Sequence, residues 1–293
     1  MRHWLKAFRL RTLPLAFSSI GMGAILAASQ GGFDLKIILL CLATTIVLQI
    51  LSNLANDYGD TIHGADSVER VGPSRTVQDG QISLPQMKIA IIIACLLSLV
   101  LGLILVFSSG LSATAIYVFL GLGLVAIVAA VLYTNGKLPY GYMGLGDISV
   151  FVFFGLIGVL GTYYLQTKIV YWDMLLPAIS CGLLTVAVLN INNIRDINSD
   201  KKAGKFSIPV RIGKSRAIIY HSTLLIIAFV CGAVYMYMHY ESLQQLLLLL
   251  VVPLLYINGR AISTKPLDQL DPYLKQMALT NIAYVLVFGI SLM

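Results

Sequence analysis

Acidic and asparagine residues gather in two short clusters along this chain. The first cluster runs from Asn53 to Asp60, and the second from Asn190 to Asp200. Only 13 Asp and Glu residues occur among 293 residues, so these clusters are the places where side chains could do chemistry. Carboxylate oxygens suit Mg2+, which is usually held by one or two carboxylates together with phosphate groups of a substrate. The clusters therefore predict a site for an anion bridged by metal.

Both clusters repeat polar side chains at intervals of four residues, which stacks them on one side of a helix. The stacked sets are Asn53 with Asp57, Asn56 with Asp60, and Asn192 with Asp196 and Asp200. The competing interpretation is helix capping, because Asn and Asp favour helix ends. An ordinary cap needs only one residue, and like charges four apart destabilise a helix unless something neutralises them. A bound metal cation would neutralise these carboxylates.

Basic residues stand close to both clusters. Arginine binds phosphate oxygens in a bidentate manner, and lysine supplies a compact charge. Arg75 follows the first cluster, and the second is surrounded by Arg195, Lys201, Lys205, Arg211 and Lys214. Basic residues beside a membrane are also expected from topology alone. We single out Arg75 and Lys205 as candidate ligands of an anion.

A third polar segment runs from Tyr133 to Asp147. Its glycines and its proline predict a tight loop between two apolar stretches. Lys137, Tyr140 and Tyr142 could contact an anionic or an aromatic ligand, although tyrosines also form interfacial belts in membrane proteins. Asp147 begins the next apolar stretch, where ionised groups are costly. We expect it to be a further acid of the site or to orient an arginine.

The elements that position these residues are membrane helices. Hydrophobic residues make up 58% and charged residues 11% of the chain, against roughly 25% charged in soluble proteins. Long apolar runs favour helices over a barrel, and a spanning helix needs about 20 residues. The chain is predicted to be an all-α membrane protein, a bundle of nine transmembrane helices. The candidate spans are 13–31, 36–56, 86–108, 111–133, 145–166, 172–193, 216–238, 243–258 and 274–293.

Charge placement predicts the orientation. With a cytoplasmic N-terminus, 18 of the 20 Lys and Arg residues fall on the cytoplasmic side, and only Lys36 and Lys168 lie outside, as the positive-inside rule requires. The net charge of +7 is therefore explained by topology, with an anionic ligand as a further explanation, and nucleic-acid binding is disfavoured. Residues 2–11 are expected to form a basic helix on the membrane surface.

The two clusters end the second and sixth spans, so they should emerge on the same, cytoplasmic side. This repetition indicates a diverged duplication within a single domain, residues 1–293. Its halves would be roughly 1–143 and 144–258, followed by a final helix, 274–293.

Taken together, the motifs resemble the UbiA-type intramembrane prenyltransferases over nearly the whole chain. They are Arg11-Thr12-Leu13-Pro14, Asn53 to Asp60 with Gly64 and Asp66, Tyr133 to Asp147, and Asn192 to Asp200 with Gly204 and Lys205. Glycine at positions 64 and 204, where the broader family often has aspartate, resembles the branch of the family that prenylates 1,4-dihydroxy-2-naphthoate. The resemblance implies nine helices around a central cavity open to the cytoplasmic side, and a polyprenyl diphosphate donor bound through two Mg2+ ions.

The resemblance also implies roles for individual residues. Metal ligands would be Asn56, Asp57, Asp60, Asp66, Asp196 and Asp200. Catalytic residues would be Asp57, Asp60, Asp196, Asp200 and Lys205. From the residue types around these motifs, and not from the resemblance, the predicted contacts to diphosphate and acceptor are Asn53, Asn56, Arg75, Lys137, Tyr140, Tyr142, Asp147, Asn192, Asn193, Arg195 and Lys201.

The implied reaction transfers a polyprenyl group to 1,4-dihydroxy-2-naphthoate with loss of CO2 and diphosphate, giving demethylmenaquinol for menaquinone synthesis at the cell inner membrane. The nearest alternatives are 4-hydroxybenzoate, haem and chlorophyll prenyltransferases. A cation-coupled transporter is the alternative from another class, but transporters usually place their acids near the bilayer midplane. We expect membrane lipid around the protein and no obligate protein partner.

Overall fold

The computed structural model describes residues 2–64, 72 and 75–292, and every regular element in this part of the chain is helical. Nine helices there are long and apolar enough to cross a membrane. The chain is an all-α membrane protein. The spans contain α2 (Leu13–Ser29), α3 (Leu35–Ile62), α4 (Leu84–Ser108), α5 (Ala113–Leu132), α8 (Leu175–Arg195), α11 (Lys214–Met238), α12 (Val252–Thr264) and α13 (Asp271–Leu292).

The fifth span is compound. It consists of α6 (Gly146–Val150), a π-helical segment (Phe151–Leu160) and α7 (Gly161–Thr167). Inside the π-helical segment Ser19 of α2 donates a hydrogen bond to the carbonyl oxygen of Phe154. Such wide turns often occur at functional sites because they shift the side chains that follow. The sequence pattern predicted this span but not its irregular hydrogen bonding.

Shorter helices complete the chain. They are α1 (Arg2–Ala7), α9 (Ile197–Lys202) and α10 (Ile208–Ile212), with 3-10 turns at Leu10–Thr12, Trp172–Met174, Leu243–Val251 and Leu267–Gln269. The eighth span begins in the third of these turns and continues to Thr264.

The predicted spans agree with the observed helices except that two of them end several residues later than predicted. The eighth span was expected to end at residue 258 and continues to Thr264, and the second span differs in a way that bears on the first cluster. The second span was expected to end at residue 56, but α3 continues to Ile62. The first cluster therefore lies inside the last turns of a helix and not beyond its end. Its acids are buried, with Asp57 and Asp60 each 2% exposed, and side chains from other segments neutralise them, which allows the helix to continue.

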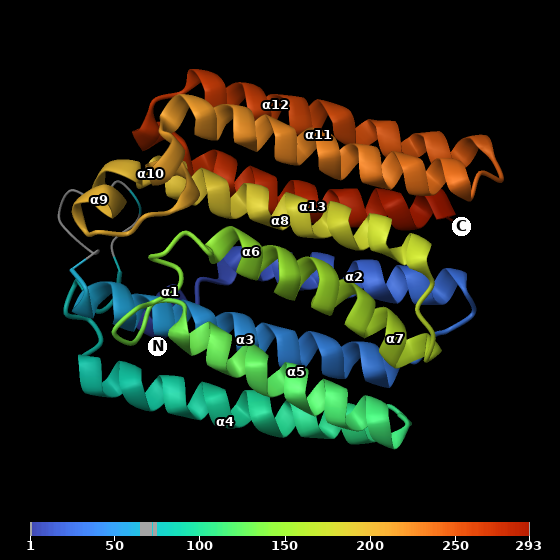
Figure 1. Ribbon diagram of the computed structural model, residues 1–293, viewed down its shortest axis with the longest axis horizontal. Helices are drawn as coiled ribbons and strands as arrows, with labels where there is room; N and C mark the ends of the chain where they lie inside the picture. Colours follow the sequence, from blue (N-terminus) through green and yellow to red (C-terminus); the bar gives the residue numbers. More distant parts are fainter. Residues whose placement is uncertain (1, 65–71, 73–74, 293) are drawn as a thin grey trace.

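Two helix groups flank a middle layer (Figure 1). In one group α8 packs against α11 and α13, and in the other α3 packs against α4 and α5. The fifth span and α2 lie between these groups and pack on each other. Gly155 and Gly182 permit the close crossing of the fifth span with α8, because a Cβ atom on Gly155 would lie 2.8 Å from the Cα of Gly182.

One end of the bundle carries α1, α9 and α10 (Figure 1). The loop of residues 133–145, which we call the bridging loop, lies at the same end (Figure 1). Its Tyr142 contacts Asp60 of the first cluster, and the backbone N–H of Phe206, just after α9, donates to the carbonyl oxygen of Tyr142. The prediction that both clusters emerge on one side of the bundle is therefore confirmed.

Candidate functional site

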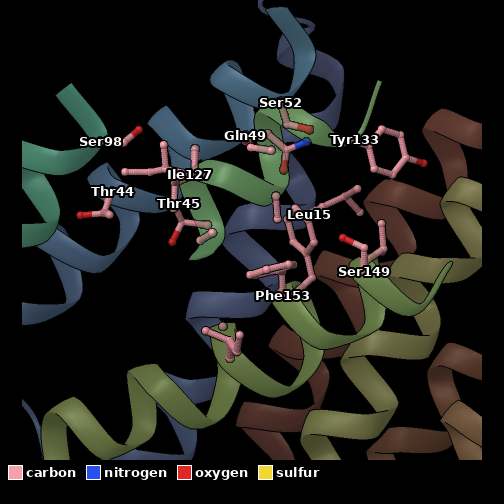
Figure 2. Close-up of a pocket in the computed structure, with 18 of the residues that line it drawn as sticks. Leu15, Thr44, Thr45, Gln49, Ser52, Ser98, Ile127, Tyr133, Ser149 and Phe153 are labelled. Atoms are coloured by element: carbon pink, nitrogen blue, oxygen red, sulfur yellow. The ribbon is translucent and has the colours of Figure 1, made fainter. Parts of the chain in front are cut away.

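A cavity of about 350 Å³ runs through the bundle from this end. Its polar end is lined by Arg9, Arg11, Asn53, Asn56, Asp60, Arg75, Asn192, Asn193 and Lys205. The remaining wall is mostly apolar and extends to Leu105 and Leu165, which lie near the far ends of α4 and α7. Figure 2 shows Leu15 and Phe153 on this wall, with Gln49 and Ser52 of α3 among the polar side chains. The cavity therefore has one polar, charged end and a mostly apolar remainder, which suits a molecule with a charged head and an apolar tail.

Arginines neutralise the first cluster. The guanidinium of Arg9 contacts the carboxylate of Asp57. Arg75 Nη1 lies 2.6 Å from Asp60 Oδ2 and 3.7 Å from Asp57 Oδ1, and it donates to the carbonyl oxygen of Asn56 at 2.9 Å. Cations that pair with buried carboxylates offset the cost of removing those carboxylates from water. Arg75 is therefore at the site, as predicted, and the pairing with Arg9 is an addition.

The N-terminal segment reaches Asp57 through a sharp turn. Arg9 has a left-handed backbone, with φ 49° and ψ 56°, which is uncommon for a residue other than glycine. Asn53 Nδ2 donates to the carbonyl oxygen of Phe8 at 3.0 Å and to Thr12 Oγ1 at 3.1 Å. The expected continuous helix over residues 2–11 is therefore wrong, since the segment breaks at Arg9 to direct its side chain inward.

Sequence reasoning did not include Arg9 and Arg11 in the site. Arg11 lines the cavity and pairs with Asp271 of α13 at 3.1 Å. The motif Arg11-Thr12-Leu13-Pro14 is a signal that could have found Arg11, but it does not include Arg9. Basic residues at a membrane surface look alike in sequence whether they face lipid head groups or a buried acid.

The second cluster keeps its four-residue interval across a change of helix. The N–H of Asp196 donates to the Asn192 carbonyl at 3.1 Å, and the N–H of Asp200 donates to the Asp196 carbonyl at 2.9 Å. Asp196 and Asp200 thus remain in one row, although α8 ends at Arg195 and α9 begins at Ile197.

Arg195 holds the second cluster to the rest of the bundle. It is 1% exposed. Its Nε and Nη2 donate to the carboxylate of Asp196 at 2.9 and 2.8 Å, and its Nη1 donates to Asp271 at 2.5 Å. Because these bonds occupy the guanidinium, Arg195 orients Asp196 within the protein.

Tyr142 and Lys205 connect the two clusters. The Tyr142 hydroxyl donates to Asp60 Oδ1 at 2.8 Å. Lys205 Nζ lies 5.8 Å from the centre of the Tyr142 ring and 3.6 Å from Asp200 Oδ1. Burial and the neighbouring Asp60 carboxylate raise the pKa of Tyr142 well above its usual value, so the hydroxyl keeps its proton and remains a donor. Both residues were predicted for the site, and the structure brings them together.

The bridging loop is held on α3 by close contacts. Thr134 Oγ1 and Asn135 Nδ2 each donate to the carbonyl oxygen of Ala55 at 3.0 Å. A Cβ atom on Gly59 would lie 2.5 Å from the carbonyl oxygen of Thr134, so only glycine allows the loop to approach this far. These contacts place Tyr142 over Asp60.

The other predicted residues are distributed around the site. Tyr140 lines the cavity and donates to the Ala129 carbonyl at 2.9 Å. Asp147 accepts a hydrogen bond from Tyr220 at 2.8 Å and joins α6 to α11. Lys137 and Lys201 are exposed. Asp66 lies outside the described residues.

The donor atoms at this end fit Mg2+. Among the described residues there is no group of three or more His, Cys, Asp and Glu side chains close enough to hold a metal ion by themselves. Mg2+ usually takes one or two carboxylates and completes its shell with water and substrate phosphates. Asn56 Oδ1 is buried and has no hydrogen-bond partner in the described structure, and buried polar atoms rarely remain so. An incoming metal ion would satisfy this oxygen.

Comparison with known proteins identifies the family. Residues 16–282 match the model of the UbiA prenyltransferase family. The chain is similar to 1,4-dihydroxy-2-naphthoate octaprenyltransferase of Haemophilus influenzae, with 44% identity over 100% of this chain and 96% of the relative. It is also similar to the protein of the same name in Escherichia coli, with 46% identity over 98% of this chain and 95% of the relative.

Solved structures show the same fold. A UbiA homologue from Aeropyrum pernix superimposes with a TM-score of 0.67 at 15% identity, over 97% of each chain. A UbiA homologue from Archaeoglobus fulgidus bound to DMAPP and Mg2+ superimposes with a TM-score of 0.64 at 17% identity, over 98% of each chain. With the family model matched over most of its length, the chain belongs to the UbiA prenyltransferase family.

Proposed function

We propose that this protein transfers a polyprenyl group from polyprenyl diphosphate to 1,4-dihydroxy-2-naphthoate, releasing CO2 and diphosphate and forming demethylmenaquinol for menaquinone synthesis. The observation that carries the reaction class is the cavity, with the Asp60 carboxylate and several cations at one end and a mostly apolar wall beyond. A diphosphate head and a prenyl tail match these two parts. The acceptor follows from the relatives with 44% and 46% identity, whose name states it.

The cations of the site would bind the diphosphate. Arg9, Arg75 and Lys205 each contact a carboxylate of the clusters, and all three line the cavity. Arginine and lysine donate to phosphate oxygens in charge-assisted hydrogen bonds. When the diphosphate binds, these side chains would turn from the carboxylates to the phosphate oxygens. That exchange would leave the carboxylate oxygens available to a metal.

Divalent metal use agrees with the Mg2+-bound homologue, and we propose two ions. The ligands would be Asn56, Asp57, Asp60, Asp196 and Asp200. When bound, Mg2+ draws negative charge from the diphosphate and makes it a better leaving group. Tyr142 would orient Asp60 in this site through its hydrogen bond, and Arg195 would orient Asp196 in the same way.

The reaction would be an electrophilic aromatic substitution. The allylic carbon–oxygen bond breaks and its electron pair leaves with the diphosphate. The electron-rich ring carbon that bears the carboxylate of the naphthoate attacks the allylic carbon. The carboxylate departs as CO2, and the pair from its bond restores the aromatic ring. Preorganised charges stabilise the separating diphosphate, and the apolar cavity wall excludes water that would otherwise trap the allylic cation.

We also propose the orientation and the domain organisation. The polar end of the cavity would face the cytoplasm at the inner membrane, since 18 of the 20 Lys and Arg residues lie on that side of the predicted topology. The chain would form one domain of two diverged halves, and each half contributes one cluster.

The test is a product analysis. Purified protein receives a polyprenyl diphosphate, Mg2+ and either 1,4-dihydroxy-2-naphthoate or 4-hydroxybenzoate. We expect turnover with the naphthoate only, and a product mass that shows the loss of CO2. A product that retains the carboxylate, or preference for the benzoate, would contradict the proposal.

A further inference from the structure

Gln49 is a buried polar residue in the cavity that the reaction described above does not use. It lies on α3, one helical turn from Asn53 on the side away from Asp60, and it lines the cavity (Figure 2). Its side chain is largely hidden from solvent, since the residue is 9% exposed. Gln49 therefore lies between the polar end of the cavity and its apolar part.

Hydrogen bonds determine how the Gln49 amide is oriented. The hydroxyl of Thr12 donates its proton to the carbonyl oxygen of Arg9 at 2.9 Å. Thr12 Oγ1 can then only accept further bonds, and it accepts from Asn53 Nδ2 at 3.1 Å and from Gln49 Nε2 at 3.2 Å. The NH2 group of Gln49 therefore faces Thr12, and Oε1 is the amide atom that this arrangement leaves for another partner.

Gln49 Oε1 is buried and has no hydrogen-bond partner in the described structure. Buried amide oxygens are nearly always paired, and leaving one unpaired is costly. An acceptor oxygen needs a ligand that carries an N–H or O–H group. The prenyl tail is a hydrocarbon and has neither, and an ionised diphosphate presents acceptor oxygens only. Of the two organic substrates of the proposed reaction, only the aromatic acceptor carries such donors, in its ring hydroxyls.

We propose that Gln49 Oε1 accepts a hydrogen bond from a ring hydroxyl of the aromatic acceptor and thereby selects a hydroxylated ring. The inference rests on the proposed function. The 1-hydroxyl of 1,4-dihydroxy-2-naphthoate is next to the carboxylate and bonds to it internally, so the 4-hydroxyl is the one free to reach Gln49. Leu15 and Phe153 line the same cavity (Figure 2) and offer apolar surface to the ring.

The hydrogen bond is tested by comparing two proteins, the wild type and one variant, each with two compounds, the dihydroxy acceptor and one analogue. Gln49→Met keeps the approximate size of the side chain and removes the acceptor oxygen. The analogue is 1-hydroxy-2-naphthoate, which lacks the 4-hydroxyl. Dissociation constants of both compounds are measured for both proteins, and KM for the polyprenyl diphosphate is measured alongside. Gln244→Met is the matched control, because Gln244 is exposed and lies outside the cavity lining.

In the wild type, we expect the analogue to bind about tenfold more weakly than the dihydroxy compound, the effect of one hydrogen bond. In Gln49→Met the two compounds should bind equally, with KM for the diphosphate unchanged. Persistent tenfold discrimination in the variant would overturn the inference. If Gln49→Met does not fold, the wild type decides, because equal binding of the two compounds there would also overturn it.

Failure of this inference can be distinguished from failure of the proposed function. Wild-type protein that does not prenylate 1,4-dihydroxy-2-naphthoate contradicts the function itself. Wild-type turnover combined with unchanged discrimination in Gln49→Met contradicts the role of Gln49 alone.

Discussion

Replacing Tyr142 by phenylalanine removes one oxygen atom from the contact that joins the bridging loop to the first cluster. The hydroxyl donates to Asp60 Oδ1 at 2.8 Å, and the two residues are 8% and 2% exposed. A buried hydrogen bond to a charged group contributes about 1.5–3 kcal/mol. The variant leaves one carboxylate oxygen of Asp60 without this donor and weakens the fixed position of the loop.

The expected result is a loss of activity greater than the loss of stability. If the bond is needed to position Asp60 in the reacting complex, its energy corresponds to a decrease in kcat/KM for the polyprenyl diphosphate of roughly 10- to 100-fold. The concentration of Mg2+ that gives half-maximal activity should rise as well, because Asp60 is a proposed metal ligand. The assay is diphosphate release at saturating acceptor, with donor and Mg2+ varied in turn.

Tyr235→Phe is the matched control. Tyr235 is 1% exposed, and its hydroxyl contacts Met174 Sδ at 3.8 Å in another part of the bundle. The control should retain wild-type kinetics. If Tyr142→Phe also retains kcat/KM within twofold and has an unchanged Mg2+ requirement, the reasoning about Asp60 is refuted. A melting temperature close to that of the control would show that an observed loss does not come from unfolding.

Four further predictions follow from the site. Asp60→Asn should abolish Mg2+-dependent diphosphate release while the protein inserts and purifies normally, and near-normal turnover would count against the metal site. Arg75→Ala should raise KM for polyprenyl diphosphate about tenfold or more, consistent with loss of a charge-assisted bond; a change confined to the acceptor would show that Arg75 serves the other substrate. Gly59→Ala should lower both melting temperature and activity, because its Cβ would lie 2.5 Å from the Thr134 carbonyl oxygen, whereas Gly121→Ala, with nothing within 4 Å, should not. Chelation of divalent cations should stop diphosphate release and added Mg2+ should restore it, and activity that survives chelation would refute metal dependence.

The helical architecture could be predicted from local sequence. Each span is an apolar run long enough to cross the bilayer, and a backbone in hydrocarbon must form its hydrogen bonds within its own segment. The four-residue spacing of Asp196 and Asp200 persisted because backbone hydrogen bonds continue from Asn192 through to Asp200. Asn56 and Asp60 both line the cavity because they are four residues apart on the same helix.

Partners from distant segments could not be predicted in this way. Arg195 pairs with Asp271, which is 76 positions away in sequence, and its charge alone does not distinguish it from Lys201 at the surface. Within the bridging loop, Lys137 and Tyr142 looked equally suited to bind an anion. Only the docking of Thr134 on α3 turns Tyr142 inward and leaves Lys137 exposed.

The sequence by itself determined the environment, the helices and the placement of the two clusters at the same end of the bundle. These properties follow from apolar length, helical period and the number of crossings, all of which are local or additive along the chain. Tertiary structure decided which cations meet which carboxylates. It brought Arg9 to Asp57 through a left-handed turn and left one buried oxygen of Gln49 without a hydrogen-bond partner in the described structure. Such contacts depend on the directions of side chains from separate helices, and spacing within one helix does not encode them.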